Sequence, residues 1–188
     1  MHSPSIARSL TYKARDSVFV FEEAVCPAAI DCIPSKMSIT PLESVKACWA
    51  RIAQGSPVYK FFFSDIEIVS AENGSMIAKL PVTENLLNSK SGLHGSVSAT
   101  IVDWAGGMAI ASTGLEKTGV STDIHVSYVS SAKLGDILTI EGKVSRVGRN
   151  LGFTTVTIYK GEGENMSVVA HGTHTKYVLR DQPPKPVS

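Results

Sequence analysis

Several residue patterns that would place this chain in a familiar class are missing from it. The 188 residues contain only three cysteines, Cys26, Cys32 and Cys48, whose spacing fits neither a zinc site nor a disulfide framework. The chain has 18 basic and 17 acidic residues, so its net charge is only +1. It therefore lacks the excess of positive charge that binding to the phosphate backbone of a nucleic acid requires. No apolar run approaches the roughly 20 residues of a membrane-spanning helix. We therefore expect free thiols, no nucleic-acid partner and no membrane span, in an intracellular protein that is cytoplasmic or mitochondrial.

The common catalytic motifs are missing as well. The sequence contains no Gly-x-Ser-x-Gly nucleophile elbow, no phosphate-binding glycine-rich loop before a helix and no His/Cys cluster with metal spacing. An enzyme with this sequence is therefore expected to use neither a serine triad nor zinc.

One compact domain fits the length and the hydrophobic content of 43%. Residues 1–39 show no sustained period and are predicted to be a poorly ordered tail, residues 40–179 to form the domain, and residues 180–188 to form a second tail. The first fifteen residues contain three basic residues, three serines and no acidic residue, which resembles a mitochondrial transit segment. The alternative is a disordered or misannotated leader, with the natural start near Met37.

Two kinds of periodicity divide the predicted domain. Residues 40–43 (Thr-Pro-Leu-Glu) combine an N-cap, a proline at the first helical position and a capping box, so a helix is predicted to about Gln54, where a glycine follows. From Ser64 the apolar residues alternate, and an Asn73-Gly74 turn indicates a hairpin. Four more strand patterns occupy residues 120–129, 137–147, 152–159 and 167–178.

A long buried helix is predicted over residues 95–113. Apolar residues from Val97 to Met108 recur at helical spacing, and small residues occupy most other positions. The pair Gly106-Gly107 costs the helix about 1 kcal/mol per glycine relative to alanine, which indicates close approach of another backbone. Strands, one buried helix and further strands predict an α+β domain in which a curved antiparallel sheet wraps around the central helix.

A polar loop, residues 88–96, leads directly into the N-terminus of this helix. Amides there, helped by the helix dipole, can stabilise a carbonyl oxygen that becomes negative, and Gly95 permits close approach of a substrate. His94 can bind substrate or hold the loop, whereas His171 and His174 are predicted to lie on a strand surface. The alternative is an ordinary loop capped by Asn or Ser.

Asp103 and Ser121 are the other candidates for chemistry. Asp103 lies on the less apolar stripe of the helix, where a carboxylate needs a partner or a function. It can attack an acyl carbon as a nucleophile, or act as a general base that activates water for this attack. The alternative is a partly solvated aspartate on an amphipathic helix. Alternation along the next strand places Ser121 on one face with Asp123, His125 and Ser127. Ser121 can therefore orient a water beside Asp103, or be plain surface.

The spacing of Gly95 and Asp103 constrains how they act. Eight helical steps at about 1.5 Å each separate their backbones by roughly 12 Å. One protomer is therefore not expected to present both groups to one carbonyl. If both act on the same carbonyl, the simplest arrangement is an isologous dimer in which Gly95 of one chain faces Asp103 of the other.

Three parts of the chain keep a joint spacing: Leu93-His94-Gly95-Ser96 with Ala99 to Asp103, Gly119 to Ile124 with Tyr128 to Asp136, and Gly172 to Lys176. Together they resemble the PaaI-type hotdog-fold thioesterases and, within them, the acyl-CoA thioesterase 13 (thioesterase superfamily member 2) group. The resemblance covers about residues 44–178.

This resemblance implies a hotdog fold and hydrolysis of an acyl-CoA to a free acid and CoA, with no metal or other cofactor. It implies a homodimer or homotetramer with active sites at the dimer interface. By the same resemblance, Asp103 activates water, Ser121 helps to position that water, and the Gly95 amide polarises the thioester carbonyl. Asn88 and His94 would support the substrate and the leaving thiolate.

The resemblance also has a departure and leaves alternatives open. Ser96 stands where many relatives have a second glycine, which is expected to leave the backbone amides available. Arg149 and Lys176 are weaker candidates for binding the CoA phosphates. The alternatives are a protein that binds an acyl thioester or a partner without hydrolysis, and a thioesterase for carrier-bound acyl groups in a biosynthetic pathway.

Overall fold

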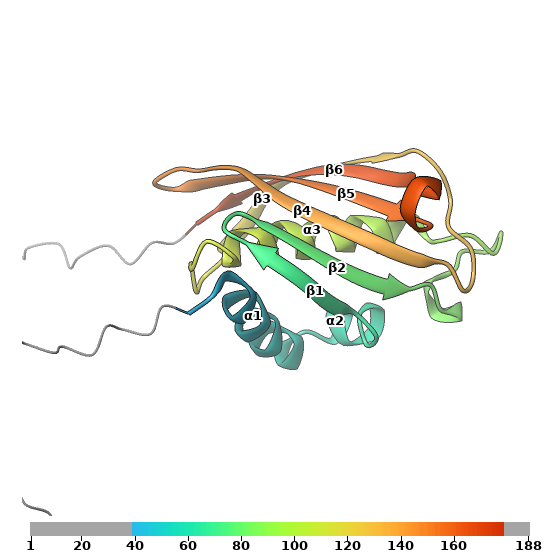
Figure 1. The fold of residues 1–188 in the computed structure, drawn as a ribbon, viewed down its shortest axis with the longest axis horizontal. Helices are drawn as coiled ribbons and strands as arrows, with labels where there is room; N and C mark the ends of the chain where they lie inside the picture. Colours follow the sequence, from blue (N-terminus) through green and yellow to red (C-terminus); the bar gives the residue numbers. More distant parts are fainter. Residues whose placement is uncertain (1–38, 179–188) are drawn as a thin grey trace, which may run out of the picture. The chain divides into compact units, whose positions relative to one another are not determined.

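The computed structural model describes residues 39–178, which form one sheet with helices packed on it (Figure 1). The predicted tails, together with Cys26 and Cys32, lie outside the described residues apart from position 39. The helices are α1 (Pro41–Gly55), α2 (Pro57–Phe62) and α3 (Gly95–Ala111), with short 3-10 turns at Glu84–Leu86 and Gly163–Asn165. The strands are β1 (Glu67–Glu72), β2 (Ser75–Pro81), β3 (Val120–Tyr128), β4 (Ile137–Val147), β5 (Leu151–Lys160) and β6 (Ser167–Tyr177).

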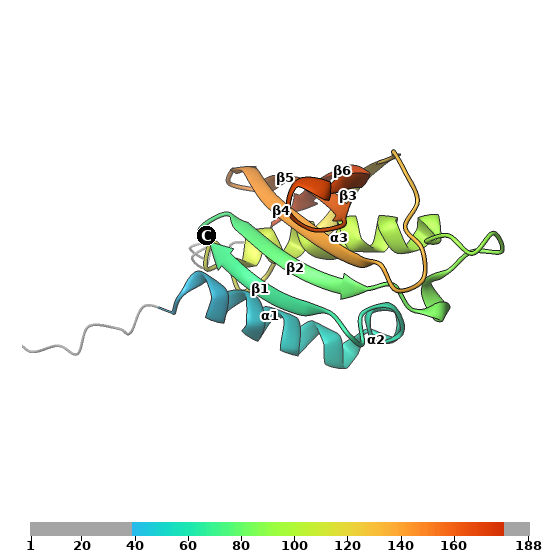
Figure 2. The ribbon, with the colours of Figure 1, turned by 45° about the vertical axis from the view of Figure 1, so that its right-hand side comes forward.

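The six strands make one antiparallel sheet in the order β1-β2-β4-β5-β6-β3. All strands except β1 have extensive contacts with α3, which lies against one face of the sheet (Figures 1 and 2). The sheet therefore wraps around the helix, and the predicted α+β architecture is confirmed. The four later strand patterns agree with β3 to β6 to within about one residue at each end, whereas β1 begins at Glu67, three residues after the predicted change of period at Ser64. The Asn73-Gly74 hairpin is present, with Gly74 at a φ of 85°.

The first helix begins and ends as predicted. The Thr40 hydroxyl accepts from the Glu43 amide at 3.2 Å, and the Glu43 carboxylate accepts from the Thr40 amide at 2.8 Å, which completes the capping box. Val45 and Cys48 are the buried residues of this helix. The helix packs on α3 and β1, and Figure 2 shows it beside β1. No helix within residues 39–178 is long and apolar enough to cross a membrane.

The second helix, α2, was not predicted from the sequence. The Ser56 hydroxyl caps it by accepting from the Tyr59 amide at 3.2 Å, and Pro57 occupies its first position. This Ser-Pro start repeats the Thr-Pro start of α1, so the capping signal was present. At six residues the helix is too short to show an apolar period.

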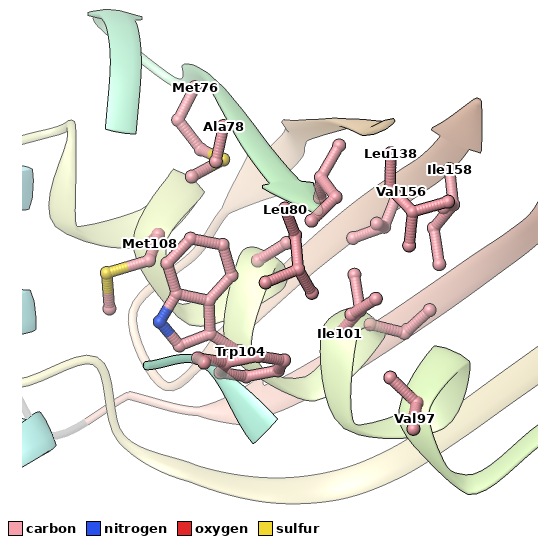
Figure 3. Close-up of a cluster of buried hydrophobic side chains, with 14 of the residues drawn as sticks. Met76, Ala78, Leu80, Val97, Ile101, Trp104, Met108, Leu138, Val156 and Ile158 are labelled. Carbon is pink, nitrogen blue, oxygen red and sulfur yellow. The ribbon is translucent and has the colours of Figure 1, made fainter. Parts of the chain in front are cut away.

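The core forms where α3 meets the concave face of the sheet. Figure 3 shows Trp104 and Met108 of α3 gathered with Leu80 of β2 and Leu138 of β4, all at most 1% exposed. Twelve of the seventeen residues of α3 are buried, so the helix is apolar on nearly every side. Asp103 is one of the few positions on it that reach solvent.

Close approach to the central helix is confirmed at Gly106 and wrong at Gly107. A Cβ at Gly106 would lie 2.6 Å from the Thr154 hydroxyl and 2.7 Å from Nδ1 of His174. The approaching atoms belong to side chains of β5 and β6, and not to a backbone as predicted. A Cβ at Gly107 would have its nearest neighbour at 3.7 Å, in the Thr118 side chain, which is ordinary van der Waals contact.

Candidate active site

The Asp103 carboxylate is the centre of a polar cluster at the rim of the core. The Ser121 hydroxyl from β3 donates to Oδ1 at 2.8 Å, and the Tyr59 hydroxyl from α2 donates to Oδ2 at 2.8 Å. On β6, His174 Nε2 lies 3.5 Å and Lys176 Nζ 4.0 Å from Oδ1. The carboxylate side chain keeps 29% exposure, so it is both supported by the protein and reachable by water.

A β-bulge in β3 turns Ser121 toward this cluster. Ser121 pairs with Lys176, whereas Asp123 already pairs with Thr175, so Thr122 is the extra residue. Ser121 therefore shares the helix-facing side with Ile124, whose partner is His174, and not with Asp123, His125 and Ser127. The predicted face of Ser121 is wrong, because an inserted residue inverts the alternation.

His174 is completely buried, so the prediction that it lies on a strand surface is wrong. Its Nε2 lies 2.9 Å from the Ser121 hydroxyl, whose oxygen accepts from the ring while its hydrogen goes to Asp103. Burial, helped by the positive charge of Lys176, lowers the pKa of His174 to about 4, so the ring is neutral at pH 7. Small residues at Ala170 and Gly172 share its side of β6 and indicated an inward face.

Lys176 lies inside the Asp103 cluster. Its side chain is nearly buried, its Nζ is 3.4 Å from the Ser121 hydroxyl, and burial lowers its pKa. A residue that binds a CoA phosphate at the surface would be exposed, whereas Lys176 is only 6% exposed. Arg149, the other candidate for that role, lies in the exposed turn between β4 and β5.

Asn88 holds the loop that precedes α3. Its side-chain oxygen accepts from the Lys90 amide at 2.9 Å and from the Gly92 amide at 3.2 Å, while its nitrogen lies 3.4 Å from the Leu93 carbonyl. These bonds fix the loop in which Ser91 takes a φ of 59°. Asn88 therefore shapes the approach to the N-terminus of α3.

His94 is the N-cap of α3. Its Nδ1 accepts from the Ser96 amide at 3.1 Å and lies 2.7 Å from the Ser96 hydroxyl. Because Nδ1 accepts, the neutral ring carries its hydrogen on Nε2. The Ser96 amide is thus engaged, contrary to the expectation that it is available. The Gly95 amide, which helix geometry leaves without an intrahelical partner, also has none elsewhere in residues 39–178.

A pocket of about 510 Å³ opens beside the carboxylate. It is lined by Ser56, Val58, Tyr59, Ala99, Thr100, Asp103, Ser121 and Ile124. Gly95, His94 and Asn88 do not line it, so one protomer brings Asp103 and Ser121 together but not the Gly95 amide. Within residues 39–178, no group of three or more His, Cys, Asp or Glu side chains could hold a metal ion.

Comparison with known proteins identifies the family. Residues 91–167 match the model of the thioesterase superfamily, 4HBT. Human acyl-coenzyme A thioesterase 13 is 38% identical over 114 residues, which are 60% of this chain and 79% of the human protein. The chain belongs to the thioesterase superfamily. The predicted family resemblance is confirmed, and this membership makes the protein a thioesterase.

Solved structures agree with this family. The crystal structure of zebrafish thioesterase superfamily member 2 matches with a TM-score of 0.66 at 33% identity, covering 74% of this chain and 99% of that one. A Streptococcus mutans protein solved with bound acetyl-CoA matches with a TM-score of 0.57 at 31% identity, covering 62% of this chain and 90% of that one. The predicted hotdog fold of this thioesterase is therefore confirmed.

Proposed function

We propose that this thioesterase hydrolyses an acyl-CoA to a free acid and CoA, with Asp103 activating the attacking water. The observation that carries the proposal is the Asp103 carboxylate, which accepts from Ser121 at 2.8 Å and faces a pocket of about 510 Å³. The likeness to a protein solved with acetyl-CoA supports a CoA ester as the substrate.

The chemistry divides between the N-terminus of α3, at Gly95, and its middle, at Asp103. Asp103 takes a proton from water as the oxygen attacks the acyl carbon, and Ser121 helps to hold that water. The carbonyl oxygen becomes an oxyanion, which the Gly95 amide stabilises with the positive end of the helix dipole. Collapse of the intermediate breaks the carbon–sulfur bond, and the proton held by Asp103 passes to the thiolate.

The proposed site needs two chains. Gly95 and Asp103 are roughly 12 Å apart along α3 by helix geometry, and Gly95 does not line the Asp103 pocket. β3 is an edge strand of the sheet, and it exposes Val120 by 60% and Tyr128 by 61%. Pairing of this edge with a second copy would bury these side chains and bring Gly95 of the partner subunit toward Asp103.

The first test is thiol release from short, long and aromatic acyl-CoAs, comparing the wild type with Asp103→Asn. The variant is expected to lose at least about 100-fold in kcat, because an amide is not a base. Asp65→Asn, at an exposed aspartate before β1, is the matched control and should keep wild-type turnover. Full activity in Asp103→Asn would remove the mechanism, and no wild-type turnover on any CoA ester would favour a carrier-bound substrate or a binding role.

The second test asks whether the site is shared between chains. Gly95→Pro deletes the amide at a helical position that accepts proline, whereas Gly95→Ala keeps the amide and places its Cβ at 3.4 Å from the Tyr128 ring. Only Gly95→Pro should lose turnover. Refolding Gly95→Pro together with Asp103→Asn should restore about a quarter of wild-type activity, since half of the dimers then hold one complete site. No restoration would contradict a shared site.

A further inference from the structure

One hydrogen bond to the Asp103 carboxylate comes from α2. This helix belongs to none of the three sequence segments on which the family resemblance was based. Tyr59 of α2 donates its hydroxyl to Oδ2 at 2.8 Å, while Ser121 donates to Oδ1 at 2.8 Å. The two donors therefore hold opposite oxygens of one carboxylate. His174 and Lys176 lie 3.5 and 4.0 Å from Oδ1, so on that side the carboxylate faces β6.

The Tyr59 ring is held rigidly enough to aim this hydroxyl. It stacks on Phe63 with ring centroids 5.7 Å apart and lies 6.0 Å from the Trp49 ring. Its backbone amide is the one that the Ser56 hydroxyl caps. The aromatic contacts and the cap fix the ring from two sides, so little conformational entropy is lost when the hydroxyl binds the carboxylate.

We propose that Tyr59 is a positioning residue for Asp103, a role that rests on the proposed hydrolysis: it anchors Oδ2 so that Oδ1 stays directed at Ser121 and the attacking water. Without this anchor, only the contacts at Oδ1 restrain χ2 of the aspartate, and terminal carboxylate torsions have broad minima. The proposal gives a role to α2, which contributes no fully buried residue to the core but reaches the middle of α3 through the hydroxyl of Tyr59.

The tyrosine hydroxyl is protonated at neutral pH and therefore acts as a donor. Burial, followed by the negative charge of Asp103, raises the pKa of Tyr59 well above its ordinary value. The hydroxyl therefore supplies a hydrogen to the carboxylate and does not compete with it as a base.

The test is Tyr59→Phe, which removes the hydroxyl and keeps the ring contacts. Loss of a hydrogen bond to a charged group should lower kcat by about 10- to 100-fold and leave KM within about 2-fold, because the substrate still binds. Tyr177→Phe, an equal change on an exposed tyrosine of β6, should leave both constants unchanged. Wild-type kcat in Tyr59→Phe, or a rise in KM alone, would overturn the positioning role.

A second measurement reports on the contact without any substrate. A double-mutant cycle of Tyr59→Phe and Asp103→Ala, followed by urea unfolding, should show non-additive stability changes because the two groups touch. Additive changes would overturn the contact. The proposed function is tested first, by turnover in the wild type and its loss in Asp103→Asn. If that test succeeds and Tyr59→Phe is fully active, only the inference about Tyr59 is overturned.

Discussion

Neutral His174 should make the fold sensitive to acid. The ring is completely buried, and its pKa falls from the ordinary 6.5 to about 4 in the folded chain. Between these values the unfolded chain binds a proton that the folded chain does not, so stability falls as pH decreases. From the cited values of 6.5 and about 4, linkage gives a loss of about 2 kcal/mol between pH 7 and pH 5 and about 3 kcal/mol by pH 4.

The assay is urea unfolding at pH 7, 6, 5 and 4.5, at one protein concentration, for the wild type and His174→Gln. Glutamine can still donate to the Ser121 hydroxyl but does not titrate, so the variant should lose about 2 kcal/mol less between pH 7 and pH 5. His171→Gln, at an exposed position on the same strand, should retain the wild-type slope. NMR titration of the five histidines provides a direct check, since one of them should remain neutral at pH 5. Equal slopes in wild type and His174→Gln, with all five rings protonated by pH 5, would refute the reasoning.

Two further predictions concern stability. Gly106→Ala should cost about 1–3 kcal/mol in the free energy of unfolding, because its Cβ would lie 2.6 and 2.7 Å from buried side chains of β5 and β6. Gly107→Ala, with its nearest contact at 3.7 Å, should be neutral or stabilising by up to about 1 kcal/mol, and equal effects at the two glycines would contradict this packing. Ser56→Ala should cost about 1 kcal/mol by removing the cap of α2, whereas Ser56→Asp should keep it. Urea unfolding measures all four variants.

The fold could be predicted because its strongest signals are local. The capping box at Thr40, the Asn73-Gly74 turn and the change from a period of two to a helical period at Gly95 each depend on neighbours in the chain. Burial of α3 followed from the apolar and small residues that occupy most of its positions. The boundaries of β3 to β6 agree to within about one residue, because turn residues mark their ends.

The candidate site was predicted only where local pattern and function coincide. Asp103 stood out as a carboxylate on an apolar helix, and the Asp103–Ser121 contact is present at 2.8 Å. Tyr59 could not be paired with Asp103 from spacing, because 44 residues separate them and α2 is a single short segment. Lys176 was interpreted by its charge alone, and a lysine with a partner carboxylate can be buried.

The face of Ser121 was predicted wrongly because of the register of β3. Regular alternation from Val126 back to Ser121 would turn the Ser121 hydroxyl away from α3, and the inserted Thr122 reverses this. The Thr122 hydroxyl bonds to the Thr175 carbonyl at 3.0 Å, so the extra residue remains tied to β6. One residue thus decides whether Ser121 meets Asp103 and His174 or faces outward with Asp123. Such a choice depends on pairing between strands more than 50 residues apart, which a period along one strand cannot encode.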